Sequence, residues 1–275
     1  MKRTARNAPR YAAAPPAAVK EAAASLWDVK LSADRLGRGM DGSIYQVTRG
    51  NAGGLVAKFM RASEWGKAEA ALTDLILVEQ RTPDSSANPY RVIFPAVVEG
   101  LILMDAREKP AWYVTLREDV EPVQAVHEEK CSDGDMRSCA LLRATNELWD
   151  ATDSFFYSAT AEEPDKAEES LDDALAHVER AERDAPAAMK GVADAISELT
   201  DRDVLLWDMH DGNWALRTQR LPRWGAAGRF VAMDYGRSSI RDEDVLARAS
   251  SMLNLRRTKM NPRRVPFASW RRVRL

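Results

Sequence analysis

The pattern of apolar residues changes once along this chain, and that change limits the folds it can adopt. Between residues 28 and 117 the apolar residues form short runs rich in Val, Ile and aromatic side chains, which are typical of strands. From there to residue 199 they recur at helical spacing, and strand-like runs return only at 204–207, 213–217 and 229–234. Strands followed by a long helical region predict an α+β fold.

The first region is expected to hold five strands and one helix. Three short strands up to residue 59 are separated by glycine-containing turns, which predicts an antiparallel meander. Ser63 is the expected N-cap of a helix that ends before Pro83. The apolar stretches 91–104 and 111–116 are predicted to be buried strands.

The composition is that of a globular protein. Of 275 residues, 45% are hydrophobic and 30% are charged, and no apolar run approaches the roughly 20 residues that span a bilayer. Pro15, Pro16 and Lys20 interrupt the apolar core that a signal peptide would need, so we expect a cytoplasmic protein. Cys131 and Cys139 are too few for a disulfide framework and are expected to be reduced thiols.

The ends of the chain differ in charge from its middle. Residues 1–25 are basic and rich in Ala and Pro, which predicts a mobile arm with a short helix near its end. Two lobes are expected at 26–117 and 118–255. The tail at 256–275 has no acid and mixes Arg with aromatic residues, which predicts an anionic partner, either nucleic acid or an acidic protein. The alternative is that its apolar residues dock on the second lobe while the arginines stay solvated.

Three glycines lie between the first two predicted strands. Gly37, Gly39 and Gly42 follow the spacing GxGxxG, and glycines let backbone N–H groups approach phosphate oxygens. The strand–loop–strand context differs from the strand–loop–helix of a dinucleotide site. The alternative is an ordinary glycine-rich hairpin turn.

Lys58 lies among apolar residues on the strand that follows the hairpin. A lysine at this place can reach phosphates that the glycines bind. Its acidic partner is expected on the next helix, where Glu69, Asp74 and Glu79 are candidates. We choose Glu69, although one sequence does not set the helix register.

Two later segments carry carboxylate and amide groups. Asp208 and Asn213 are five residues apart in a loop between strands, where an Asp can orient and deprotonate a hydroxyl and an Asn can bind a metal ion. Asp234 ends the last predicted strand and is followed by Tyr235 and Gly236, which suits a magnesium ligand. Taken alone, Asp211-Gly212-Asn213 would be read as a tight turn.

In this order, the four motifs resemble the protein-kinase superfamily over about residues 30–240. The resemblance implies a two-lobed protein-kinase-like fold, with a small antiparallel-sheet N-lobe containing one helix and a larger, mainly helical C-lobe. It implies ATP and Mg²⁺ as cofactors, with Lys58 and Asp208 catalytic and Asn213 and Asp234 on the metal. The further residues implied to bind ATP are Gly37, Gly39, Gly42, Val47, Ala57, Glu69 and the hinge residues Arg117, Glu118 and Asp119.

The catalytic loop departs from that of standard protein kinases. Leu206 and Trp207 replace His-Arg, and the pattern Asp-x-His-x-x-Asn is similar to that of aminoglycoside phosphotransferases. His210 then either bonds the catalytic Asp or a phosphate, or only structures the loop. The loop and the Arg-rich end also resemble the serine/threonine protein kinases of short-tailed bacteriophages, which implies phosphorylation of host proteins in the bacterial cytoplasm during host takeover.

Three alternatives stay open. A small-molecule kinase would need an acidic acceptor pocket, which the acid-rich segment 162–184 is placed to supply. A nucleotide-binding regulator would lack catalysis, and a nucleotidyltransferase would transfer AMP. Taken by itself, the segment 162–184 is expected to be a solvated helix face and not a metal site, and His127 and His177 are expected at the surface.

Overall fold

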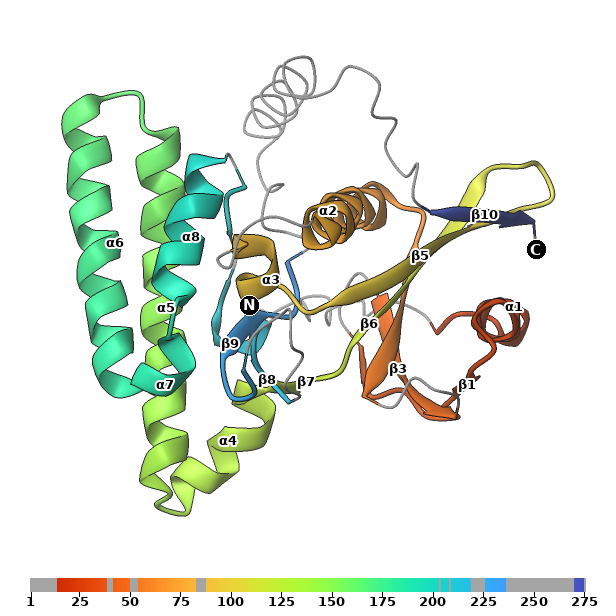
Figure 1. Ribbon diagram of the computed structural model, residues 1–275, viewed down its shortest axis with the longest axis horizontal. Coiled ribbons are helices and arrows are strands. Elements are labelled where there is room, and N and C mark those ends of the chain that lie inside the picture. The colour runs from red at the N-terminus through yellow and green to blue at the C-terminus, as the bar shows by residue number, and fades with distance from the viewer. Residues whose placement is uncertain are drawn as a thin grey trace, which may run out of the picture. The chain divides into compact units, whose positions relative to one another are not determined.

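The computed structural model describes residues 14–38, 42–49, 54–82, 88–202, 204–207, 209–218, 226–235 and 270–274 (Figure 1). It is an α+β protein, as the pattern predicts, with a curled, mainly antiparallel sheet and several helices. The chain divides into two compact units. Unit 1 comprises residues 1–74, 97–118 and 269–275, and unit 2 comprises residues 75–96 and 119–268. No helix in the described ranges is both long and apolar enough to cross a membrane.

Unit 1 is built on a 7-stranded sheet. Its strands are β1 (Lys30–Leu31), β2 (Gly37–Arg38), β3 (Gly42–Arg49), β4 (Leu55–Arg61), β5 (Val97–Met104), β6 (Pro110–Glu118) and β10 (Arg271–Arg274). The spatial order is β1-β3-β4-β6-β5-β10, and β2 pairs with β3. The neighbouring strands β1 to β4 are antiparallel, which confirms the predicted meander.

Helix α1 (Ala17–Trp27) covers one face of this sheet. Its buried residues Val19 and Ala23 belong to a core cluster with Tyr45, Ala57 and Phe59 of the central strands. The rings of Tyr45 and Phe59 meet edge to face at 5.7 Å. The short helix expected near the end of the 1–25 arm is therefore confirmed as α1, but this half of the arm packs in a hydrophobic core and is not a mobile segment.

Helix α2 (Glu64–Arg81) begins where its cap predicts. The Ser63 hydroxyl accepts a hydrogen bond from the Gly66 N–H at 3.1 Å, and the helix ends two residues before Pro83. The predicted strand at 91–104 is wrong in its first part. Asn88 caps a short helix, α3 (Pro89–Ile93), by accepting from the Tyr90 N–H, so the strand begins only at β5.

Unit 2 contains the helical region that the periodicity predicts. Its helices are α4 (Val123–Ser132), α5 (Met136–Thr160), α6 (Pro164–Asp184), α7 (Pro186–Met189) and α8 (Val192–Asp201). The long helices α5 and α6 lie side by side (Figure 1). Helix α6 buries Ala174, Val178 and Ala181, and its charged residues are largely exposed, as expected of a solvated helix face. The described residues contain no cluster of acids, His or Cys suited to a metal.

A small antiparallel sheet completes unit 2. It consists of β7 (Val120–Pro122), β8 (Trp214–Arg217) and β9 (Phe230–Ala232), in that order. A single 3-10 turn, η1 (Asp211–Asn213), leads into β8. The predicted strand at 204–207 is irregular backbone, whereas the two later strands are confirmed.

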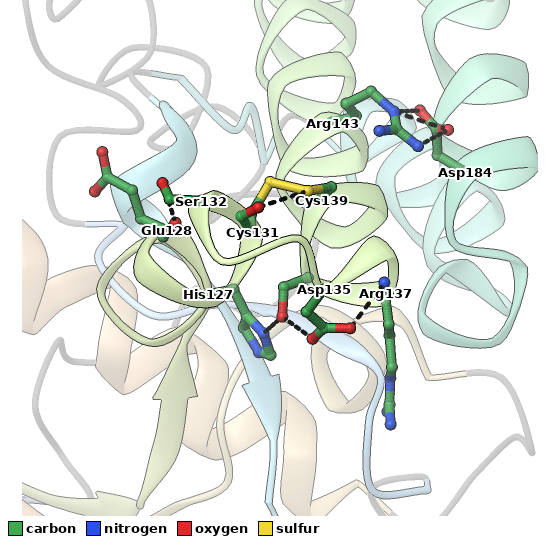
Figure 2. Close-up of a disulfide and its surroundings, with 10 residues drawn as sticks. His127, Glu128, Cys131, Ser132, Asp135, Arg137, Cys139, Arg143 and Asp184 are labelled. Carbon is green, nitrogen blue, oxygen red and sulfur yellow. Dashed lines mark hydrogen bonds and ion pairs between the residues drawn. A yellow bond between two sulfur atoms is a disulfide. The ribbon is translucent and has the colours of Figure 1, made fainter.

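Cys131 and Cys139 form a disulfide that joins α4 to α5 (Figure 2), so the expectation of two reduced thiols is wrong. The tight turn between the helices brings their Cα atoms to 4.7 Å, which a spacing of eight residues does not reveal. His127 is also not at the surface. It is buried, with Nδ1 2.8 Å from the Ser138 hydroxyl and Nε2 3.1 Å from Glu121.

The basic tail ends as an edge strand of unit 1. Strand β10 pairs in parallel with β5, and Trp270 just before it is buried against Gly100 and Tyr113. Arg271 pairs with Glu99 while its side chain stays half exposed. Trp270 therefore docks on the first sheet, and not on the second lobe as the alternative held, whereas Phe267 lies outside the described residues. Residues 256–269 lie outside the described ranges.

Candidate active site

Lys58 is a buried charged residue on the sheet of unit 1. It lies in β4 with 3% of its surface exposed and forms an ion pair with Glu69 of α2. Glu69 is itself 1% exposed. The Ser63 cap fixes the start of α2, and with this start Glu69 faces the sheet. The structure therefore pairs Lys58 with the acid chosen from the sequence, and the role of the pair at a nucleotide stays a prediction.

The glycine hairpin lies beside this ion pair. Gly37 opposes Ile44 in the β2–β3 ladder, and Gly42 opposes Met60 in the β3–β4 ladder. A Cβ atom on residue 42 would lie 2.7 Å from the Phe59 carbonyl oxygen and 3.3 Å from Lys58 Cε. Glycine is therefore required where β3 passes the lysine. Gly39 lies outside the described residues.

Strand register separates two predicted ATP contacts from Lys58. Side chains alternate between faces along a strand, so Ala57 points away from the face of Lys58 and into the α1 core. Val47 lies on the face of Ala57, because Tyr45 is the direct partner of Ala57. This corrects the assignment of Val47 and Ala57 to the same site as the lysine.

Two other apolar residues share the face of Lys58. Ile44 is the cross-strand partner of Lys58, and Val56 precedes the lysine by two residues, so both lie on its face of the sheet. Counting in steps of two from Lys58 along the sequence would have found Val56. Finding Ile44 would also have required the hairpin register.

The predicted hinge coincides with the point where the chain passes from unit 1 to unit 2. Arg117 and Glu118 end β6 and are both buried, and Asp119 is the first residue of the unit 2 segment. Arg117 opposes Val56, so it lies on the face of Lys58, whereas Glu118 lies on the other face. The Asp119 carbonyl accepts from the Thr218 hydroxyl at 2.9 Å, and burial raises the pKa of the Asp119 carboxyl.

In unit 2 the structure brings Asn213 and Asp234 to the same end of one hairpin. Trp214 of β8 opposes Ala232 of β9, so Asn213 directly precedes one strand and Asp234 closely follows the other. The Met233 N–H donates to the Asn213 carbonyl at 2.9 Å. Both side chains are partly exposed, and their oxygens are of the kind that bind Mg²⁺. Asp208 lies outside the described residues.

The loop before Asn213 is held by its own hydrogen bonds. His210 Nδ1 accepts from the Gly212 N–H at 3.1 Å, and the His210 carbonyl accepts from the Asn213 N–H at 2.8 Å. The buried Trp214 donates its indole N–H to the Met209 carbonyl at 2.9 Å. These contacts favour the loop-structuring alternative for His210, whose ring also meets that of Trp149 edge to face.

Two buried residues support the Asp234 strand, and of these the sequence analysis named only Tyr235, as part of the motif that follows Asp234. The Arg217 side chain donates to the carbonyls of Arg91 and Phe94 at 2.9 and 3.1 Å, which ties β8 to α3. Tyr235 is 1% exposed, and its ring lies 5.0 Å from that of Phe94. The residue after Asp234 is thus anchored in the core, which fixes the backbone that carries the carboxylate.

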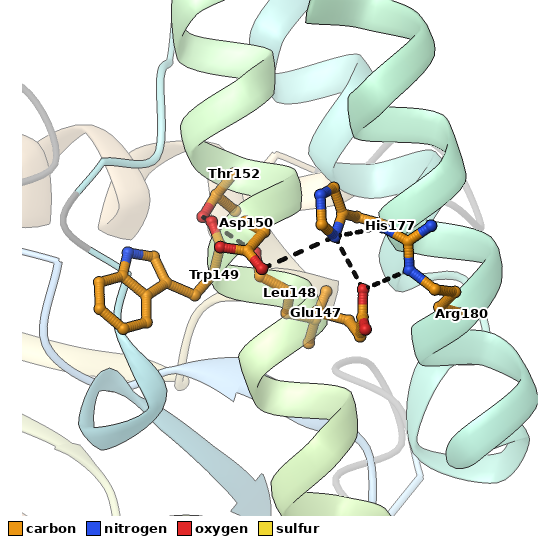
Figure 3. A network of polar contacts seen from close by, with 7 residues as sticks. All are labelled: Glu147, Leu148, Trp149, Asp150, Thr152, His177 and Arg180. Atoms are coloured by element: carbon orange, nitrogen blue, oxygen red, sulfur yellow. Dashed lines mark hydrogen bonds and ion pairs between the residues drawn. The ribbon is translucent and has the colours of Figure 1, made fainter.

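The hollow described beside α6 is not lined by acids of that helix. A hollow of about 310 Å³ lies among α5, α6 and α8, and α6 contributes only Leu171 to its lining. The one acid in the lining is Asp201 of α8. Farther along α6, His177 and Arg180 both contact Glu147 of α5 at 2.7 Å (Figure 3), so these charges satisfy one another.

Comparison with protein-family models, with curated proteins and with solved structures finds no match for this chain. Functional inference therefore rests on the residues of the two units. Lys58, Glu69 and Gly42 belong to unit 1, Asn213 and Asp234 belong to unit 2, and each group is described within its own unit.

Proposed function

We propose that this protein is an ATP- and Mg²⁺-dependent phosphotransferase with a two-lobed, protein-kinase-like fold. The buried Lys58–Glu69 ion pair beside Gly42 carries the proposal. Burying two charges has a large desolvation cost, and apolar residues of the same volume would stabilise the sheet as well or better. A buried pair next to a required glycine is more simply explained by a phosphate ligand, for which Lys58 supplies charge and the hairpin supplies N–H groups.

The residues divide the chemistry between them. Bound ATP supplies the γ-phosphoryl group, and Mg²⁺ offsets the charge of the phosphate oxygens. Asn213 and Asp234 would hold the metal, and Lys58 would neutralise the phosphates. Asp208 would orient the acceptor hydroxyl and take its proton as the oxygen–phosphorus bond forms and the bond to the ADP oxygen breaks. Positioning and electrostatics account for most catalysis of this kind.

The proposed acceptor is a Ser or Thr hydroxyl of bacterial host proteins. This part of the proposal comes from the resemblance of the 208–213 loop and the Arg-rich tail to phage protein kinases. Helix α6 supplies no acid to the hollow beside it, which gives a cationic small molecule no acidic α6 pocket there. The preference for a protein acceptor therefore rests on the resemblance, and the small-molecule acceptor is an outcome of the test.

The test is labelling of a bacterial lysate with γ-labelled ATP and Mg²⁺. We expect specific labelled proteins with the wild type, none with Asp208→Asn, and at least about a 100-fold slower transfer with Lys58→Met. Lys67→Met, an exposed lysine on the same helix as Glu69, is the matched control and should behave as wild type.

Each other outcome has a defined meaning. Undiminished transfer in both the Asp208 and Lys58 variants would overturn the assignment. Label that appears only from ATP marked at the α-phosphate would identify AMP transfer. ATP binding without any protein label would leave a small-molecule acceptor or a regulator, which ADP release with added aminoglycosides separates.

A further inference from the structure

Arg117 is a buried cation in apolar surroundings. It is 4% exposed, and its cross-strand neighbours are Val56 and Val97, each also 4% exposed. Across the described residues, no hydrogen bond or ion pair involves its guanidinium group. Lys58, by contrast, is compensated by Glu69. Arg117 therefore has no partner for its positive charge among the described residues, and its guanidinium nitrogens keep some contact with solvent, because none of them is a fully buried unpaired atom.

Such a charge has a high cost in free energy. An ion that is mostly enclosed by protein loses part of its hydration, and a partner of opposite charge can replace the lost water. A guanidinium cannot avoid this cost by losing its proton. A nearly buried arginine without a protein partner is therefore well placed to bind an anionic ligand.

Strand register places Arg117 close to the Lys58–Glu69 pair. Lys58 opposes Thr115 across the β4–β6 ladder, and Arg117 follows Thr115 by two residues on the same face. Diagonal neighbours of this kind have Cβ atoms about 7–8 Å apart, which long side chains can bridge. Lys58 and Arg117 can thus contact neighbouring groups of one extended anion.

We propose that Arg117 is a second phosphate-binding residue, which grips an oligophosphate together with Lys58. Its planar fork of N–H donors matches two oxygens of one phosphate, whereas the lysine acts as a point charge. That the oligophosphate belongs to ATP rests on the proposed function; that Arg117 binds an oligophosphate does not. The sequence analysis named Arg117 only as a hinge residue of the ATP site, and phosphate binding together with Lys58 is a different role.

The experiment measures binding of inorganic tripolyphosphate and of ATP by calorimetry, together with Tm without ligand. Arg117→Met should weaken tripolyphosphate binding by about 10- to 100-fold, the range for a charge-assisted pair of hydrogen bonds. Its Tm without ligand should be unchanged or higher, because an uncompensated buried charge is removed. The tripolyphosphate affinity of Arg117→Lys should lie between that of the wild type and that of Arg117→Met.

Arg61→Met is the matched control. Arg61 lies on β4, stacks over Trp112 and is on the opposite face of the sheet, so its loss should leave tripolyphosphate binding at the wild-type level. An Arg117→Met protein with a lower Tm and wild-type affinity would show a structural role and overturn the inference. So would a wild type that binds malonate, a dicarboxylate, as tightly as tripolyphosphate.

The outcomes separate this inference from the proposed function. Phosphoryl transfer that depends on Lys58 but is indifferent to Arg117→Met, with wild-type tripolyphosphate binding in that variant, would remove only the role of Arg117. Tripolyphosphate binding that depends on Arg117, in a protein without any phosphoryl transfer, would remove only the proposed function.

Discussion

Glu147 illustrates how single charged residues make part of the stability depend on pH. Burial raises the pKa of its carboxyl, but the hydrogen bonds and charges of Arg180 and His177 outweigh burial, so the pKa is lowered overall. A carboxyl with a lowered pKa in the folded state stabilises the protein above its unfolded pKa of about 4.3. That contribution is lost as the pH falls through the lower pKa of the folded state.

We therefore expect Glu147→Gln to lower Tm at pH 7 and to have little effect near pH 3. The side chain is 26% exposed, so the loss at neutral pH is modest, about 1 kcal/mol or less. Thermal unfolding of both proteins across this pH range is the measurement. Glu163→Gln, in the exposed pair with Lys166, is the control and should show no such dependence. A Tm difference that grows toward low pH would contradict the assignment.

Local signals predicted part of the site. The Ser63 cap marked the start of α2, but the sequence did not set which of Glu69, Asp74 and Glu79 faces Lys58, and the structure pairs the lysine with the chosen Glu69. Val47 and Ala57 were misplaced because their face depends on the pairing of two strands. The surroundings of Arg117 depend in the same way on β4 and β5, which are distant in sequence.

At the scale of elements, the α4–α5 hairpin supports the loop that carries His210 and Asn213. Gln124 of α4 has its Oε1 3.0 Å from where a Cβ on Gly212 would lie, and Trp149 of α5 meets the His210 ring. The Cys131–Cys139 disulfide joins these two helices near their connecting turn. Reduction of the disulfide is therefore expected to affect the loop that carries His210 and Asn213 as well as the α4–α5 hairpin.

Reduction should destabilise unit 2 by about 2–3 kcal/mol, the chain-entropy value for a loop as short as the one between Cys131 and Cys139. Thermal unfolding with and without dithiothreitol measures the change. Cys139→Ser should have the same Tm with and without dithiothreitol, and this Tm should equal that of the reduced wild type. A wild type whose Tm is the same with and without reductant would contradict a stabilising disulfide.

Helices with clear capping residues and breakers at their ends were predicted well. Segments whose conformation depends on contacts with other parts of the chain were not. Helix α2 has a serine cap and a following proline, and both marked its ends correctly. The apolar residues of α3 were predicted as strand because the helix that starts at the Asn88 cap has only five residues, which is too short to show a helical period. The stretch 204–207 has the apolar composition of a strand, but composition does not provide a neighbouring strand to pair with.

At the scale of the whole molecule, unit 1 combines segments from distant parts of the chain. The sequence marked the change of character near residues 117–119, where the described units also divide. It did not show that β10 belongs with the first sheet. Pairing between strands so far apart leaves no periodic signal, and the arginines of the tail suggested an anionic partner in place of a strand.

Trp270 packs directly on Gly100, and this contact helps to hold β10 against β5. A Cβ on residue 100 would lie 2.3 Å from two ring carbons of Trp270, so Gly100→Ala should displace the indole and destabilise unit 1 by about 1–3 kcal/mol. Trypsin should then cleave faster within β10, between Arg271 and Arg274, as mass spectrometry of the fragments would record. In a Trp270→Ala background, Gly100→Ala should change the stability little, because the indole ring that its Cβ would contact is absent. Additive losses of stability would argue against this contact.

The late arrival of β10 also sets the order in which the protein can be completed on the ribosome. Arg271 lies 172 residues after its partner Glu99 on β5. At bacterial and eukaryotic synthesis rates this separation takes roughly 10–30 s. Throughout that interval the newly made β5 has an open edge, and open edges invite pairing with other nascent chains. Conditions that slow translation late in the message should therefore lower the yield of native protein more than the same delay placed early.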